Sequence, residues 1–169
     1  FQVAAQTLND IKQLQPGDPR IDYLLSRAFA SSDSEQANAA LQRALQRNPQ
    51  HVPSLLAMAD AAINRERYAD AEAVLTQVLE VNVHQPEAWA LLAVIAHLRG
   101  QGEIEQLMRA AALSTWAENP EVDHLIGRKL SQLYRFAEGA EYQRRALTFD
   151  PGHPGASFQL AEDLLRLGY

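Results

Sequence analysis

Two stretches of the sequence repeat each other: Arg43–Pro53 reads RALQRNPQHVP, and Arg145–Pro154 reads RALTFDPGHP. They begin 102 residues apart, which is three times 34. A fixed period of about 20 to 50 residues is typical of folds that stack copies of one small unit. At steps of 34 the sequence matches itself in several apolar columns without a gap. One such column consists of Leu45, Leu79, Leu113 and Leu147. We therefore expect a repeat fold in which this leucine column is largely buried.

Each repeat carries the spacing of two amphipathic helices. The second repeat shows the i, i+3, i+4, i+7 pattern of one buried helix face at Leu55, Met58, Ala59 and Ala62. Prolines occur at the first or second residue of a unit, where a helix can accept them because the missing N–H would have no partner. These prolines are Pro53, Pro86, Pro120 and Pro154. Strand-like alternation is absent, so the sequence predicts an all-α fold of antiparallel helix pairs.

The period divides the chain into four complete units, at residues 18–51, 52–85, 86–119 and 120–153. Residues 1–15 then correspond to the second helix of a preceding unit, and residues 154–169 to the first helix of a truncated unit. Because both ends fall inside units, and the chain starts at Phe1 without a methionine, we expect a piece of a longer protein made of this single array.

The third unit departs from the pattern. In its second helix the positions expected to be apolar hold Glu105 and Arg109. An apolar stripe occurs one residue earlier, at Ile104, Met108, Ala111 and Ala112. We expect a turn shortened by one residue to bring this stripe to the core.

The composition excludes several classes of function. With 47% hydrophobic and 21% charged residues the chain is globular, and its net charge of −6 disfavours nucleic acids and anionic membranes. No apolar run approaches the roughly 18 residues of a membrane span. The absence of cysteine excludes disulfides and thiolate sites but leaves the compartment open. We expect a soluble chain, which in a bacterium would suit the cytoplasm or the periplasm.

Catalytic and metal-binding patterns are also missing. The histidines form no i, i+4 pair; they are His51, His84, His97, His124 and His153. Neighbouring residues such as Asp123 and His124 point about 100° apart on a helix, so they do not form the hydrogen bond of a catalytic triad. Gly100-Gln101-Gly102 is too short for a phosphate-binding loop. We expect no catalytic residue, no metal and no cofactor.

The helix pairs resemble the tetratricopeptide repeat (TPR) family, whose pattern is W-x2-L-G-x2-Y, then A-x3-F, then P. Trp89-x2-Leu92-Ala93 matches the first half, and Ala37-x3-Leu41 matches the second. The resemblance implies an α-α superhelix, a TPR solenoid, that acts as a non-enzymatic scaffold and binds a peptide segment or a partner domain in a concave groove. The alternative is a non-catalytic TPR arm of a larger multidomain protein, with or without an enzyme domain.

The family's concave wall comes mainly from the first helix of each unit. Carried over by position, the expected groove residues are Asp22, Tyr23, Phe29, Leu56, Asp60, Ile63, Asn64, Glu87, Leu91, Val94, His97, His124, Arg128, Gln132, Gln159 and Arg166. A TPR subgroup that grips chaperone carboxylates has lysine and asparagine where this chain has Asp22 and Ser26. That chaperone clamp is therefore not expected.

The charges along the expected groove suggest a direction. Acidic residues lie in its N-terminal half and Arg128 in its C-terminal half, so a peptide would place its acidic end near Arg128 and its basic end near Asp60. The alternative is a solvated face whose charges only keep the chain soluble. The last helix lacks a covering helix, and we expect weak self-association through apolar residues at its end. These residues are Phe158, Leu160, Leu164, Leu165 and Leu167.

Overall fold

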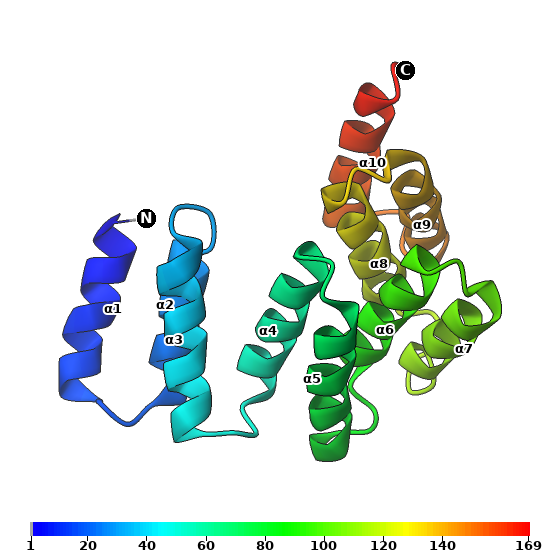
Figure 1. Ribbon diagram of the computed structural model, residues 1–169. Coiled ribbons are helices and arrows are strands. Elements are labelled where there is room, and N and C mark those ends of the chain that lie inside the picture. Colours follow the sequence, from blue (N-terminus) through cyan, green and yellow to red (C-terminus); the bar gives the residue numbers. More distant parts are fainter. Residues whose placement is uncertain (1) are drawn as a thin grey trace. The chain divides into compact units, whose positions relative to one another are not determined.

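The computed structural model describes residues 2–169, with side chains from residue 3 onward. Ten helices and no strand are found in this part of the chain (Figure 1). The helices are α1 (Gln2–Leu14), α2 (Pro19–Phe29), α3 (Ser34–Arg47), α4 (Val52–Asn64), α5 (Tyr68–Val81), α6 (Pro86–Leu98), α7 (Gly102–Ala112), α8 (Pro120–Gln132), α9 (Phe136–Phe149) and α10 (Pro154–Arg166). The predicted all-α class is confirmed.

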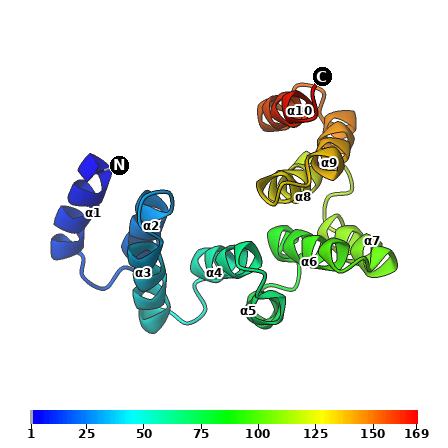
Figure 2. The ribbon, with the colours of Figure 1, turned by 45° about the horizontal axis from the view of Figure 1, so that its top comes forward.

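Neighbouring helices form the predicted pairs. Extensive contacts join α2 with α3, α4 with α5, α6 with α7, and α8 with α9. Figures 1 and 2 show α2 beside α3 and α8 beside α9. The second helices of the four pairs begin at Ser34, Tyr68, Gly102 and Phe136, at the predicted interval of 34. The limits assigned to the repeat units stay a prediction.

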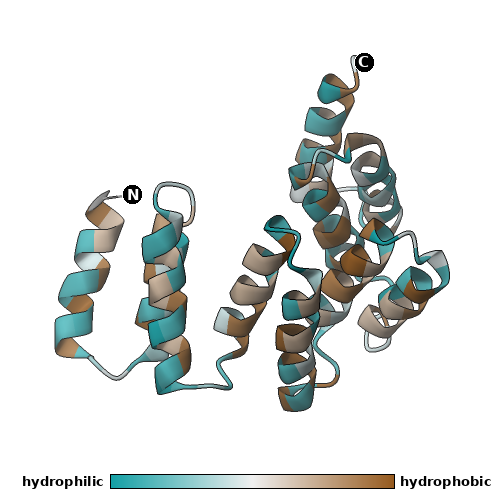
Figure 3. Ribbon diagram, viewed as in Figure 1, coloured by the Kyte–Doolittle hydropathy of each residue, from teal (hydrophilic) through white to brown (hydrophobic). Residues whose placement is uncertain are grey.

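The contacts divide the chain into two compact parts. The N-unit comprises residues 1–81 and the C-unit residues 82–169. In the N-unit, α1 packs on the α2–α3 pair through Ala5, Ile21, Leu25 and Ala40. In the C-unit, α8 contacts α6, α9 and α10. Figure 3 shows hydrophobic and hydrophilic residues alternating along the helices, as expected of amphipathic helices.

Local sequence explains where the first helices begin. Each of α2, α4, α6, α8 and α10 has a proline in its first two positions. Side chains cap several starts: Asp18 accepts a hydrogen bond from the N–H of Arg20, and Asn119 accepts one from the N–H of Glu121. These caps satisfy N–H groups that a helix leaves unpaired in its first turn. None of the helices in residues 2–169 has the length and apolar character needed to cross a membrane.

The buried column of the second helices lies one residue before the predicted leucines. Ala44, Val78, Ala112 and Ala146 are almost completely buried, whereas Leu45, Leu79, Leu113 and Leu147 are half-buried. Consecutive residues point about 100° apart on a helix, so the leucines lie at the edge of the buried face. The expectation that the leucines are largely buried was wrong.

Small residues let the paired helices approach closely. A Cβ added to Gly127 in α8 would lie 2.5 Å from Gln143 Nε2 and 2.8 Å from the carbonyl oxygen of Gly139 in α9. The equivalent residues Ala59 and Ala93 are fully buried. Any larger side chain at these positions would overpack the pair.

The expected register shift in the third pair is absent. Helix α7 begins at Gly102, 34 residues after α5, so Glu105 and Arg109 face inward while Ile104 is 42% exposed. Glu105 accepts a hydrogen bond from the hydroxyl of Tyr142, and Arg109 pairs with a buried carboxylate. Because both charged side chains have partners in the interior, the helix does not need to turn the apolar stripe inward in their place. The prediction of a shortened turn was wrong.

Candidate binding surface

The structure separates the predicted groove residues by exposure. The buried ones are Asp22, Leu56, Ile63, Leu91 and Val94. The half-buried ones are Tyr23, Phe29, Asp60, His97, His124 and Gln159. The exposed ones are Asn64, Glu87, Arg128, Gln132 and Arg166. As a correction to the predicted groove, we do not keep the fully buried Asp22, Ile63 and Val94 as contact residues, because their side chains are enclosed by the protein itself. A groove along the whole chain stays a prediction.

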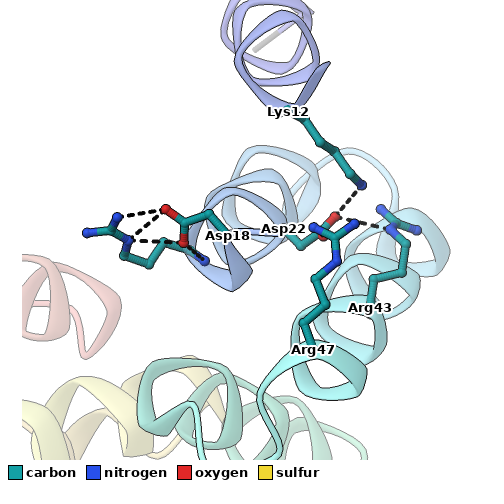
Figure 4. A network of polar contacts seen from close by, with 6 residues as sticks. Lys12, Asp18, Asp22, Arg43 and Arg47 are labelled. Atoms are coloured by element: carbon teal, nitrogen blue, oxygen red, sulfur yellow. Dashed lines mark hydrogen bonds and ion pairs between the residues drawn. The ribbon is translucent and has the colours of Figure 1, made fainter. Parts of the chain in front are cut away.

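Asp22 is the centre of an ion cluster in the N-unit. Its carboxylate is completely buried in α2 and lies 2.6 Å from Lys12 Nζ, 3.1 Å from Arg43 Nε and 3.1 Å from Arg47 Nη1 (Figure 4). Oδ1 accepts hydrogen bonds from Lys12 and Arg43, whereas Oδ2 faces Arg47 without hydrogen-bond geometry. A buried carboxylate needs such partners, because removing a charge from water is costly.

Three helices position this cluster. Lys12 lies in the last turn of α1, and Arg43 and Arg47 lie one turn apart on α3. The prediction missed these three cations, because it considered only the first helix of each pair, whereas α3 is the second helix of its pair and α1 precedes that pair. The i, i+4 spacing of Arg43 and Arg47 was the available signal.

In the C-unit, His97 is engaged by neighbouring helices. Its Nδ1 lies 3.0 Å from Glu105 Oε2 in α7, and its ring contacts the ring of Tyr142 in α9 edge to face. Burial and then the hydrogen bond to Glu105 raise the pKa of Tyr142. His97 and Tyr142 therefore belong to a structural network joining α6, α7 and α9.

His124 is likewise engaged. Gln143 donates from Nε2 to the backbone carbonyl of His124, and its Oε1 lies 2.8 Å from His124 Nδ1. Nδ1 must therefore carry the proton in this bond. The ring of His124 lies 5.0 Å from that of His153, whose Nδ1 accepts from the N–H of Ala156 and so caps α10. These contacts join α8, α9 and the start of α10.

A buried ion pair links α7 with α8. Arg109 donates from Nε and Nη2 to the two carboxylate oxygens of Asp123, each at 2.5 Å. The hydrogen bonds to Asp123 raise the pKa of Arg109 further above its usual value. The two-pronged geometry fixes the orientation of both side chains.

Arg128 and Gln132 remain available on α8. Both are exposed, although most of α8 is buried. Arg128 makes no ion pair with any residue from 3 to 169. Because α8 contacts α6 and α10, the exposed Glu87 and Arg166 come from adjacent first helices. We call Glu87, Arg128, Gln132 and Arg166 the C-unit polar surface.

The described side chains do not form a metal centre. Within residues 3–169, no three histidine, aspartate or glutamate side chains converge in a way that would hold a metal ion.

The last helix leaves an apolar face open. Phe158, Leu165 and Leu167 are exposed, while Leu160 and Leu164 are half-buried. The predicted self-association through this end stays a prediction.

Comparison with known proteins identifies the repeat. Residues 28–95 match the tetratricopeptide repeat family. None of the curated proteins compared with the chain matches its sequence. Among solved structures, a thermophilic TPR protein of Thermus thermophilus is similar at 18% identity and a TM-score of 0.70, over 95% of this chain and 89% of that one. YrrB, a TPR protein described as having an unusual peptide-binding site, is similar at 15% identity and a TM-score of 0.61, over 97% and 85%.

Yeast Tom70 has a TM-score of 0.65 at 15% identity, over 96% of this chain and 36% of its own. Identities this low show the fold alone. TPR proteins are in general non-catalytic repeat scaffolds for interactions between proteins. Residues 28–95 of this chain are thus similar in sequence to the tetratricopeptide repeat family, and the fold of helix pairs is similar to that of solved TPR proteins.

Proposed function

We propose that the chain is a protein-interaction scaffold that holds a peptide segment or a partner domain against the exposed sides of its first helices. The similarity to YrrB, a TPR protein with a peptide-binding site, supports this proposal. In the C-unit the contact surface is the polar surface formed by α6, α8 and α10.

The main observation behind this proposal is the exposed, unpaired guanidinium group of Arg128 within residues 3–169. It lies on a mostly buried helix, it is exposed, and it has no carboxylate partner within residues 3–169. Gln132, one turn further along, adds an amide that both donates and accepts hydrogen bonds. A guanidinium group of this kind matches a carboxylate with two parallel hydrogen bonds. We expect the acidic end of a bound peptide at Arg128 and its basic end towards Glu87.

The charges should set the direction of the peptide more than its affinity, because desolvation offsets much of the Coulomb energy. Half-buried apolar side chains on the same helices would supply most of the binding energy. This division of roles predicts that a charge reversal at Arg128 changes which peptides bind.

A displayed peptide library selected on the full chain tests the proposal. We expect peptides with an acidic group beside an apolar core, and a loss of affinity of about tenfold in Arg128→Glu, which corresponds to about 1.4 kcal/mol. Arg65→Glu is the matched control, because Arg65 is also exposed and its replacement changes the net charge by the same amount. Equal losses in both variants would mean that only the overall charge matters, and the proposed surface would be wrong.

A further inference from the structure

The N-unit cluster around Asp22 has more positive than negative charge. Three cations, Lys12, Arg43 and Arg47, surround a single buried carboxylate, which leaves a local charge of +2. Within residues 3–169, Asp22 is the one residue with which these cations form ion pairs. This local excess occurs in a chain whose net charge is −6. Burying one carboxylate does not require three cations.

The cations are ordered but still reach solvent. Their side chains are 23% exposed for Lys12, 43% for Arg43 and 29% for Arg47. Each uses one nitrogen towards Asp22, whereas an ammonium has three N–H donors and a guanidinium has five. Figure 4 shows the three side chains converging on Asp22 from α1 and α3.

Asp22 prepares these donors for a ligand. Long cationic side chains normally lose rotamer freedom when they bind a partner, and this loss weakens binding. Here the internal carboxylate has already restricted them. The remaining N–H groups of Arg43 and Arg47 are free to meet a second carboxylate, which the planar guanidinium group matches in geometry.

We propose that Lys12, Arg43 and Arg47 form an anion-binding site that takes a carboxylate of an acidic peptide segment. The site differs from the chaperone clamp, whose lysine and asparagine positions hold Asp22 and Ser26 here, because its cations come from α1 and α3 rather than from α2. It rests on the proposed function only in that the carboxylate belongs to a peptide. It also differs from the predicted polarity, which counted Asp22 among the acidic residues of the N-terminal half of the groove and placed the basic end of a peptide near Asp60.

The probe is a capped peptide of six glutamates, with a capped peptide of six glutamines as the uncharged comparison. The measurements are calorimetric affinity for the full chain and NMR of the arginine Nε–H groups. We expect the glutamate peptide to shift the Arg43 and Arg47 signals and to bind more weakly as salt rises. Arg43→Gln and Arg47→Gln should each weaken binding by about three- to tenfold, the size of one half-exposed charged hydrogen bond.

Arg65→Gln is the matched control and should leave the affinity unchanged, because Arg65 is an exposed cation of the same unit with no part in the cluster. Asp22→Asn tests the ordering role of the buried carboxylate. It removes the ion pairs that hold Lys12, Arg43 and Arg47, so it should weaken binding of the glutamate peptide although it raises the cluster charge from +2 to +3. Tighter binding in this variant would mean that charge alone attracts the peptide, and the ordering role given to Asp22 would be wrong.

Three results would overturn the proposal. The first is an equal loss in Arg65→Gln and in the cluster variants. The second is a response of the Arg43 and Arg47 signals to inorganic phosphate but not to the glutamate peptide. The third is binding that disappears in Arg128→Glu and persists in Arg43→Gln, which would refute this site and leave the proposed function intact.

Discussion

Removing Arg109 should destabilise the C-unit much more than removing its partner Asp123. Asp123 is completely buried, whereas the side chain of Arg109 is 24% exposed. In Arg109→Leu the carboxylate stays inside without its two hydrogen bonds, at a cost of about 3–5 kcal/mol. In Asp123→Leu the guanidinium can turn towards water, so the loss should be about 1–3 kcal/mol.

The equivalent positions in an earlier repeat suggest which residues should replace Arg109 and Asp123 together. The positions 68 residues earlier in the repeat hold Leu41 and Leu55, and both are buried. Replacing both members of a buried ion pair with apolar residues is often neutral or stabilising. We therefore expect Arg109→Leu with Asp123→Leu to lie within about 1 kcal/mol of the original chain, or above it in stability.

Urea unfolding followed by tryptophan fluorescence measures these effects, because both tryptophans, Trp89 and Trp116, lie in the C-unit. Circular dichroism of the same samples reports all helices and serves as the comparison. A loss below about 1 kcal/mol in Arg109→Leu would refute the reasoning. So would a double variant less stable than Arg109→Leu alone.

Three further predictions concern packing and pH. Gly139→Ala should cost about 1–3 kcal/mol of unfolding free energy, since the added Cβ would lie 3.1 Å or less from three atoms of neighbouring residues. A Cβ added at Gly102 has open space, so Gly102→Ala should not destabilise the chain, and thermal unfolding compares the two variants. Leu75→Ala should cost about 2–5 kcal/mol and the half-buried Leu79→Ala clearly less, and equal losses in urea would contradict the corrected core. The raised pKa of Tyr142 stabilises the fold fully at pH values below about 10, the pKa of tyrosine in the unfolded chain, and this stabilisation is lost as the pH rises further. Tyr142→Phe should therefore reduce the fall in unfolding free energy at alkaline pH. An unchanged alkaline profile would count against this.

The sequence was sufficient to predict the helix pairs. Prolines mark the first helices, and the small residues Ala59, Ala93 and Gly127 mark where paired helices approach closely. Both signals are local consequences of backbone geometry, so they can be recognised without knowledge of any contact between distant residues. The interval of 34 between second helices follows from the same signals.

The register of α7 could not be predicted in this way. An apolar stripe beginning at Ile104 competed with a register that turns Glu105 and Arg109 inward. The second arrangement is favourable only because Tyr142 and Asp123 supply hydrogen-bond partners from other helices. Hydrophobic periodicity contains no information about such partners, and it therefore favours the stripe.

The sign of the charge that a binding surface presents also depends on which side chains pair with one another in the fold. In the sequence, Asp22 counts as a negative charge at the N-terminal end of the predicted groove, yet in the fold it is buried and three cations cover it. A buried carboxylate recruits cations to its surroundings, and when it recruits more than one, the surface above it becomes positive. The charge that a ligand meets is then opposite to that of the first-helix residue. Arg128 keeps its predicted sign because it is exposed and unpaired within residues 3–169, so both ends of the chain would attract acidic groups.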